Sequence, residues 1–339
     1  MIWLTWRQFR PSAVGAAAAL ALLAAVFAVT GPGLADEYST GLAACATQRS
    51  SCSGLGQQFF RDHRIPFLAV TGLVLVLPAL IGLFWGAPLI SQELETGTHR
   101  LVWNQSITRF RWLAVKLGLV GLAAMVAAGL GSLAVTWWAG PIDRTATADF
   151  PRLEPVLFAA RGIVPVGYAA FAFALGVAVG MLLRRTLPAM AITLAVFAAV
   201  QIAVPVLVRP HLRAPVRSTI EISDSNTAEF NVSRIGPRQV TVDTGDTGAW
   251  LLSSRTVDGS GRAVDFIDVP ESSGPCNGRS PGSTPGECMA EMTRLGYRLQ
   301  VTYQPASRFW PFQWIETGIY AALALGLAGF CLWRIRHLD

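Results

Sequence analysis

Long uncharged stretches alternate with short charged segments along this chain. Five uncharged runs hold 25, 28, 26, 22 and 23 residues, and a sixth of 17 residues starts at Thr317. A helix needs about 20 predominantly apolar residues to cross a bilayer. Six buried helices of a soluble protein are the alternative, but such helices rarely run beyond about 14 residues without a charge. The pattern therefore predicts six transmembrane helices, at about 13–31, 66–89, 114–139, 159–183, 187–208 and 313–333.

The composition supports this interpretation. Charged residues make up 14% of the chain and apolar residues 52%, and the mean hydropathy is +0.44. A typical soluble domain has about 25% charged residues. These values exclude an ordinary soluble enzyme and a disordered chain. The basic residues are spread along the chain and not gathered in one segment, which argues against nucleic acid as a partner.

The distribution of Arg and Lys predicts on which side of the membrane the termini and loops lie. With a cytoplasmic N-terminus, ten Arg and Lys residues flank the inner ends of the spans and six lie in the two short outer loops. Inner loops of membrane proteins carry the excess of basic residues. We therefore expect both termini in the cytoplasm and the long segment 209–312 outside.

The first twelve residues have a pattern of their own. Residues 1–12 predict an amphipathic helix that lies in the inner headgroup region and is broken at Pro11, before the first span. An aromatic belt without a further role is an alternative, and so is a cleaved signal peptide over the first span. The aromatic and basic residues of the segment are Trp3, Trp6, Arg7, Phe9 and Arg10.

Segment 209–312 differs in character from the spans. It contains 11 Arg and 11 acidic residues, and short alternating runs are separated by clusters of Gly, Pro, Asp and Ser. This pattern is typical of strands and turns. The fold class is thus an all-α polytopic membrane protein with an inserted β-rich extracytoplasmic domain, followed by 313–339 as the last span and a cytoplasmic tail. The predicted strands are Ser218–Ile222, Gln239–Val242, Trp250–Ser254 and Tyr297–Tyr303.

Four of the five cysteines fall in the predicted outer segments. Cys45 and Cys52 lie in the first outer loop, and Cys276 and Cys288 lie in the long one. Two close pairs in an oxidising compartment predict two local disulfides, although four free thiols are the alternative.

Several kinds of chemistry are missing. The only lysine, Lys116, is far from any glycine-rich loop, so the phosphate-binding motif of ATPases is absent. There is no catalytic set and no metal-binding spacing. Because ionisable groups are scarce in the spans, the sequence argues against coupling to protons or sodium and predicts an energy source on a partner. The polar residues in or near the spans are Thr71, Ser132, Thr136, Arg161, Tyr168, Thr193, Gln201 and Glu316.

The inner loop between the second and third spans, residues 91–116, is the most informative stretch. Glu93 and Glu95 follow the second span, Gly97 permits a turn, and 98–105 could form a short surface helix. Basic residues then mark the return to the membrane. From spacing alone, acids and bases that merely decorate an inner loop explain the stretch equally well.

The residues of this loop resemble a known family. The run E-x-E-x-G-T, then Q-S-x-x-R and a lysine at the start of the next span, is similar to permease subunits of type-2 ABC exporters. It resembles in particular actinobacterial permeases with a G-T-H-R-L-x-W-x-Q-S-x-x-R-x-R-W-L-x-x-K segment. The layout of six spans with cytoplasmic termini and the largest outer loop between the fifth and sixth spans agrees with that family.

The resemblance implies a function and its residues. Segment 91–112 would be the coupling loop that docks on a separate ATP-binding subunit, which would hold ATP and Mg, so this chain has no cofactor. The glutamates would pair with basic groups of that partner. A second permease chain, identical or paralogous, and membrane lipid would be further partners, in a bacterial plasma membrane. A membrane-anchored sensor or scaffold is the alternative. The implied coupling residues are Glu93, Glu95, Gly97, Thr98, His99, Arg100, Arg109, Lys116, Arg184 and Arg185.

Overall fold

The computed structural model divides the chain into two compact units. It describes residues 2–48, 53–97, 108–144, 151–221, 227–230, 240–242, 248–264 and 285–337. Unit 1 consists of Met1–Thr145, Pro155–Arg209 and Trp310–Asp339, and unit 2 of Ala146–Glu154 and Pro210–Phe309. Unit 2 thus covers most of the predicted outer segment, but Arg209 belongs to unit 1.

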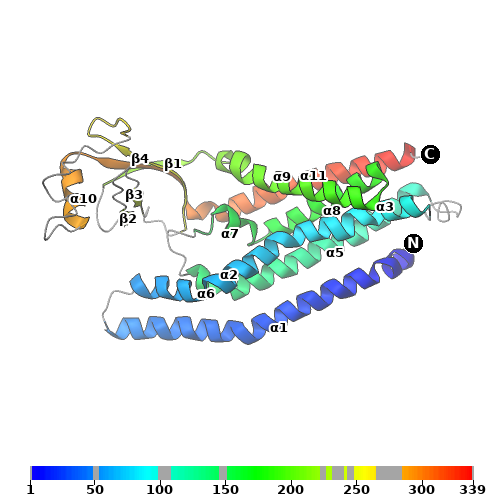
Figure 1. The fold of residues 1–339 in the computed structure, drawn as a ribbon, viewed down its shortest axis with the longest axis horizontal. Helices are drawn as coiled ribbons and strands as arrows, with labels where there is room; N and C mark the ends of the chain where they lie inside the picture. The colour runs from blue at the N-terminus through cyan, green and yellow to red at the C-terminus, as the bar shows by residue number, and fades with distance from the viewer. Residues whose placement is uncertain are drawn as a thin grey trace. The chain divides into compact units, whose positions relative to one another are not determined.

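Unit 1 is a bundle of helices (Figure 1). Its elements are α1 (Ile2–Gln48), α2 (Ser53–Ile81), the π-helix η1 (Gly82–Gly86), α3 (Ala87–Thr96), α5 (Arg109–Trp138), α6 (Gly140–Arg144), α7 (Pro155–Ala159), α8 (Val164–Leu183), α9 (Thr186–Ala203), the π-helix η2 (Val204–Val208), the 3-10 helix η3 (Arg209–His211), α11 (Phe309–Arg334) and the 3-10 helix η5 (Ile335–His337).

Six helical segments among the described residues are long and apolar enough to cross a membrane, which confirms the predicted fold class. The fourth starts later than predicted, since a turn with Gly162 at φ 67° precedes Val164. The six segments are Thr5–Ala44, Gln58–Thr96, Arg109–Trp138, Val164–Leu183, Thr186–His211 and Ala306–His337.

The predicted break at Pro11 is wrong. Helix α1 runs without interruption through both Pro11 and Pro32. Proline removes one backbone hydrogen bond and crowds the carbonyl four residues before it. An apolar environment nevertheless favours the continuous helix, because unwinding would leave further backbone groups without partners.

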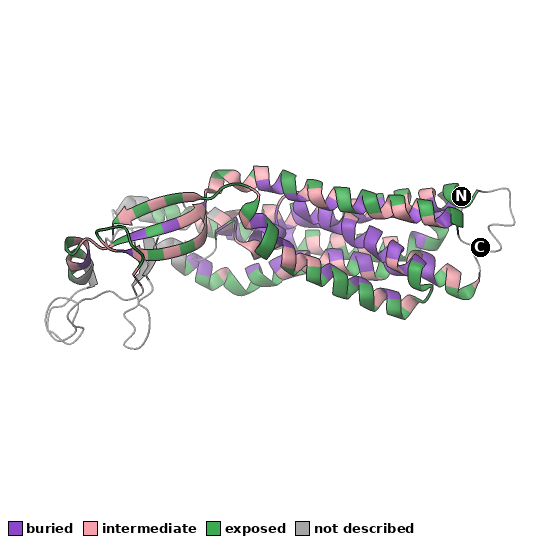
Figure 2. Ribbon diagram, turned by 90° about the horizontal axis from the view of Figure 1, so that it is seen from above, coloured by how far each residue is buried: buried purple, intermediate pink, exposed green. Residues whose placement is uncertain are grey.

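Helix α8 lies at the centre of the bundle. In the most apolar 18-residue stretch of α8, 72% is buried inside the protein. In the corresponding stretch of α1, only 6% is buried. Figure 2 shows the buried residues gathered in the middle of the helical unit. Its partners α2, α3, α5, α9 and α11 therefore expose much of their apolar surface, as expected of helices that face lipid.

Glycines allow α8 to pack directly against η1 and α3. A Cβ atom on Gly176 would lie 2.5 Å from the Gly82 carbonyl oxygen, and one on Gly180 would lie 2.5 Å from that of Ala87. On the facing side, a Cβ on Gly86 would lie 2.6 Å from the Phe173 oxygen. Gly82 and Gly86 of the second span therefore face Gly176 and Gly180 of the fourth, and the two backbones are in contact.

Unit 2 contains a three-stranded antiparallel sheet in the order β1-β5-β4, with Val216 opposite Tyr303 and a bulge between Leu251 and Ser253. Strands β2 and β3 form a separate antiparallel pair. The four predicted strands overlap β1, β3, β4 and β5, whereas β2 and α10 were not predicted. The bounds are β1 (Val216–Glu221), β2 (Thr227–Phe230), β3 (Val240–Val242), β4 (Trp250–Val257), α10 (Pro285–Arg294), β5 (Arg298–Gln304) and the 3-10 helix η4 (Ala306–Arg308).

The two predicted disulfides stay predictions. Cys52 and Cys276 lie outside the described residues. Cys45 and Cys288 lie in α1 and α10, where the structure describes the backbone only.

The glycine contacts generate a stability prediction. We expect Gly176→Ala to destabilise the bundle by about 1–3 kcal/mol, because its methyl group would collide with backbone atoms that cannot rotate away. Gly326→Ala in α11 is the matched control, since a Cβ there meets nothing within 4 Å. Thermal unfolding of the two variants in nanodiscs measures the difference, and equal midpoints would contradict the prediction.

Candidate functional site

The described residues of the predicted coupling set gather at one end of unit 1. Glu93, Glu95 and Gly97 end α3, Arg109 and Lys116 lie in the first turns of α5, and Arg184 and Arg185 form the turn between α8 and α9. Both chain ends lie at this end too, as Figure 1 shows. We call it the terminal end. Thr98, His99 and Arg100 lie outside the described residues.

Glu93 and Lys116 form a buried ion pair that joins α3 to α5. The Lys116 ammonium donates to Glu93 Oε1, and the two side chains are only 3% and 14% exposed. The ammonium also lies 4.7 Å from the centre of the Trp112 ring. Removing one member of such a pair leaves a buried charge without compensation. This pair holds the two helices that lead into and out of the segment 98–107.

Glu95 joins the same end of α3 to α9. Its Oε2 accepts hydrogen bonds from the Thr186 backbone N–H at 2.9 Å and from the Thr186 hydroxyl at 2.8 Å. The first N–H groups of a helix lack intrahelical acceptors and attract a carboxylate. Ser91, which is fully buried, donates to the Thr186 hydroxyl at 3.3 Å. The carboxylate therefore supplies the N-terminal cap of α9 from another helix.

The backbone conformation at three positions fits these connections. Gly97 has φ 73° and ends α3 in the left-handed region, where glycine has no steric penalty. Arg184 has φ 55°, which is uncommon for a residue with a side chain. Thr108 caps α5, as its hydroxyl accepts from the Arg111 N–H at 3.3 Å.

Both glutamate carboxylates have partners within this chain, at the end of α3. Their predicted contact with basic groups of another protein stays a prediction. Arg109, Arg184 and Arg185 are exposed at the same end.

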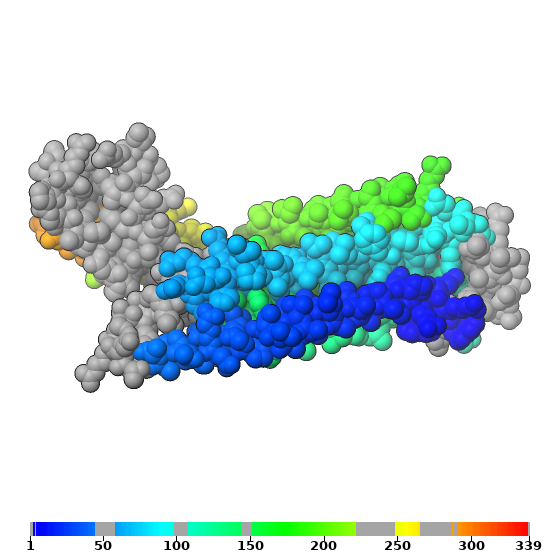
Figure 3. Space-filling view, turned by 60° about the horizontal axis from the view of Figure 1, so that its bottom comes forward, coloured from blue at the N-terminus to red at the C-terminus, as the bar shows by residue number. Residues whose placement is uncertain are grey.

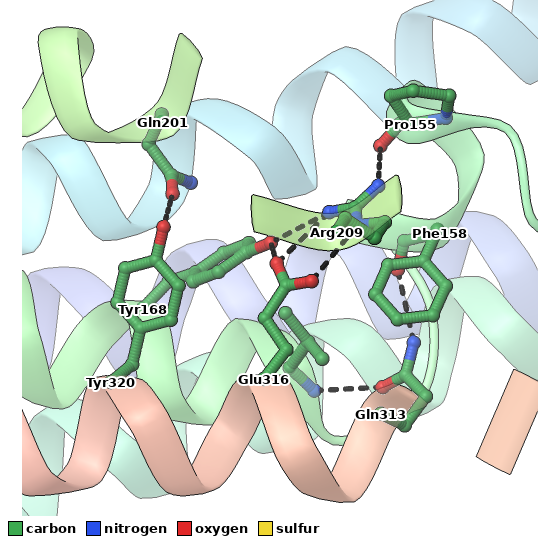
Figure 4. Close-up of polar contacts among 9 residues, drawn as sticks. Pro155, Phe158, Tyr168, Gln201, Arg209, Gln313, Glu316 and Tyr320 are labelled. Carbon is green, nitrogen blue, oxygen red and sulfur yellow. Dashed lines mark hydrogen bonds and ion pairs between the residues drawn. The ribbon is translucent and has the colours of Figure 1, made fainter. Parts of the chain in front are cut away.

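The opposite end of unit 1 holds a buried ion pair that the sequence analysis did not predict. Arg209 of η3 donates to both oxygens of Glu316 in α11 at 2.9 Å, and both side chains are 0% exposed (Figure 4). The Tyr168 hydroxyl of α8 donates to Glu316 Oε1 at 2.5 Å, and the Arg209 guanidinium lies 4.2 Å from the centre of the Phe158 ring. Three elements far apart in the chain meet at this pair.

Neighbouring polar side chains extend the pair. Gln313 accepts from the Ile163 and Val164 N–H groups at 3.0 Å each and donates to the Phe158 carbonyl at 3.1 Å. We call Tyr168, Arg209, Gln313 and Glu316 the buried polar cluster. One turn further along α11, Tyr320 donates to Gln201 of α9 at 2.7 Å (Figure 4).

A further buried ion pair joins α6 to the turn before α8. Arg161, only 3% exposed, donates to Asp143 of α6 at 3.3 Å. Ser132 of α5 donates to the Gly162 carbonyl at 2.8 Å, next to it. Arg161 was counted as an outer-loop residue by its charge, but the structure buries it.

A signal for the cluster was present in the sequence. Glu316 is the only charge between Arg308 and Arg334, and Arg209 follows an uncharged run of 23 residues. Opposite charges at the ends of the fifth and sixth spans can neutralise each other if those spans pack together. Sequence alone does not say which spans are neighbours, so the pair was missed.

No group of three His, Cys, Asp or Glu residues within the described ranges could hold a metal ion. Among the described residues, polar contacts between helices gather at both ends of the bundle: Glu93–Lys116 and Glu95–Thr186 at the terminal end, and Arg209–Glu316 and Arg161–Asp143 at the opposite end.

The comparisons with known proteins identify a family. The model of the family described as ABC-2 membrane transporter related matches residues 17–209, which is more than half of the 339 residues. Neither the curated proteins nor the solved structures gave a match.

The terminal ion pair generates a double-variant prediction. We expect Lys116→Met to destabilise unit 1 by about 3–5 kcal/mol, because Glu93 is left buried without its cation. Adding Glu93→Leu should recover most of the loss, since the unpaired charge is then gone. Thermal unfolding of the single and double variants checks this, and additive losses would contradict it.

The buried polar cluster generates a second prediction about stability. Glu316→Gln leaves the Arg209 guanidinium buried without a counter-charge, so we expect a loss of about 3–5 kcal/mol. Glu291→Gln is the control, because its partner Arg294 is 73% exposed and such surface pairs contribute at most about 1 kcal/mol. Similar unfolding temperatures for both variants would show that the Arg209–Glu316 pair is not needed for stability.

Proposed function

This chain belongs to the ABC-2 membrane transporter related family, the permeases of type-2 ABC transporters, and we propose that it exports its substrate with energy from a separate ATP-binding subunit. The ATP-binding subunit docks on the terminal end, which faces the cytoplasm together with both chain ends. Two permease chains complete the transporter in a bacterial plasma membrane.

The connections at the two ends of segment 98–107 carry this proposal. The end of α3 is tied to α5 through Lys116 and to α9 through Thr186. A force applied to the segment therefore reaches three spans through short, buried or charge-assisted contacts. A scaffold that only displays unit 2 has no need of such links.

The exposed arginines supply the docking surface. Arg184 and Arg185 lie in the two-residue turn between α8 and α9, beside the cap formed by Glu95. Because α8 is the central helix, a contact at this turn acts directly on the core of the bundle. Exposed guanidinium groups recognise carboxylates on a partner surface in a bidentate geometry.

The buried polar cluster completes the mechanism. It ties η3, α8 and α11 together at the end away from the docking surface. In this proposal it keeps that end closed while the terminal end is open, and the movement of α8 on ATP binding releases it. Packed interfaces switch between discrete arrangements and do not deform continuously.

A charge-removal experiment checks the docking surface. In Arg184→Gly/Arg185→Ala the backbone is retained, because glycine adopts the φ of 55° readily, and two positive charges are lost. We expect about tenfold weaker association with the co-purifying ATP-binding subunit, or about 1.4 kcal/mol, and a matching loss of stimulated ATP hydrolysis.

Arg217→Ala/Arg262→Ala is the matched control, since it removes two exposed positive charges from unit 2. Pull-down and ATPase assays of both double variants in nanodiscs decide the question. The docking assignment fails if the Arg184/Arg185 variant binds and stimulates the ATP-binding subunit as well as the control does.

A further inference from the structure

The fifth span presents one inner face to the bundle as far as the start of the π-helix η2. The buried residues of α9 are Ala189, Thr193 and Phe197, which recur every four residues, as expected of one face of an α-helix. Val204 continues this buried face as the first residue of η2. Figure 3 shows α9 in light green on the outside of unit 1, so its opposite face is open to the surroundings.

The burial pattern changes after Val204. A regular α-helix brings the third and fourth residues further along onto the same face, and here these are Leu207 and Val208. Their exposed fractions are 67% and 38%, whereas Arg209 is 0% exposed. The Arg209 backbone N–H donates to the Val204 carbonyl, five residues earlier. This wide turn holds one residue more than an α-helical turn, so Arg209 takes the inner position that Val208 would otherwise occupy.

The wide turn therefore delivers the Arg209 side chain to Glu316. Figure 4 shows the guanidinium pointing at the Glu316 carboxylate, to which it donates two hydrogen bonds of 2.9 Å. If η2 were a regular α-helix, Arg209 would lie about 100° further round the helix axis, away from the inner face. Leu207 and Val208 would then turn inward. The π and α forms of this one turn thus give two discrete arrangements, with and without the ion pair.

Two features favour the π form over the α form. Pro205 has no N–H for the Gln201 carbonyl, and its ring crowds that carbonyl in an α-helix. Proline alone does not impose a π turn, because α1 stays an α-helix through both of its prolines. The Arg209–Glu316 pair, which needs the wide turn, supplies the remaining preference. Breaking the pair therefore favours the return of η2 to an α-helix.

We infer that η2 is a conformational switch that opens and closes the buried polar cluster. In the π form Arg209 is paired with Glu316 and Leu207 points outward; in the α form Leu207 points inward and the pair is open. The inference rests on the proposed function only for the step in which the switch is used. The switch itself belongs to this chain and is measured without ATP or a partner subunit. A failed docking experiment would therefore leave it standing, and its own failure would leave the docking proposal standing.

Thiol labelling at position 207 reports which form is present. The side chain of Leu207→Cys is open to N-ethylmaleimide in the π form and shielded in the α form. Ile202→Cys is the matched reference, because Ile202 is 69% exposed and precedes η2, so its direction is the same in both forms. The whole chain is labelled in detergent micelles. Peptide mass spectrometry then gives the ratio of the labelling rates at positions 207 and 202, separately from the native cysteines.

Removing the counter-charge tests the coupling between the ion pair and the turn. We expect Glu316→Gln to lower the ratio of labelling rates by about threefold or more, since Arg209 loses the partner that holds the π form. Pro205→Ala should lower the ratio too, because alanine restores the N–H that the α form needs. Pro32→Ala is the control and should leave the ratio unchanged, because it lies in α1, which is an α-helix throughout.

A one-residue deletion provides the structural control. Val206 is 63% exposed, and without it Arg209 follows Val204 by four residues, which keeps both on one face of a regular α-helix. The chain without Val206 should therefore retain the Arg209–Glu316 pair and an outward residue 207 without any π turn. Glu316→Gln in this shortened chain should leave the ratio unchanged, because the second form no longer exists.

Two outcomes would overturn the inference. The first is an unchanged ratio in Glu316→Gln, because the wide turn would then not depend on the ion pair. The second is an equal drop in the chain without Val206, because loss of the pair would then loosen the segment and not rotate it. A rise in the Ile202→Cys rate marks a misfolded Glu316→Gln chain, and in that case Pro205→Ala decides by the same two criteria.

Discussion

The backbone contact between α8 and the η1–α3 segment is the constraint on which the rest of unit 1 depends. With Gly176 and Gly180 against Gly82 and Ala87, the two helices approach so closely that no side chain fits between them. Helices in lipid gain little from apolar burial, so this close packing supplies association that the hydrophobic effect cannot. It fixes α8 at the centre and thereby places the ends of α3, α5 and α9 beside one another.

The polar links at both ends follow from that packing. At the terminal end, α3 is close enough to α5 and α9 for Glu93 and Glu95 to reach Lys116 and Thr186. At the opposite end, α8 brings Tyr168 to the Arg209–Glu316 pair. Buried charges are costly in a membrane and are kept where they pair. Helix α8 packs against α3, which carries both glutamates, and contributes Tyr168 to the opposite pair.

The sequence determines the spans more fully than the sites. Each of the six predicted spans overlaps one of the long apolar helical segments, because the need for about 20 apolar residues is a local property. The bounds agree less well, since the first segment runs from Thr5 to Ala44 and not over 13–31. The sequence contains the glycine pairs Gly82/Gly86 and Gly176/Gly180 at helical spacing, but it does not show that they face each other. Arg209, Arg161 and Glu316 were treated as residues near membrane boundaries, since burial depends on neighbours that are distant in the chain. The glutamates were found, but their partners Lys116 and Thr186 could not be assigned.

What this sequence determined by itself is the membrane class, the number of spans, the β-rich insertion and the loop whose residues resemble a coupling element. These properties depend on local composition, periodicity and motif. Only the tertiary structure decided which helix is central and which charges pair. The reason is physical: ion pairs, caps and cavities are made by side chains from several helices, and their geometry exists only when those helices pack.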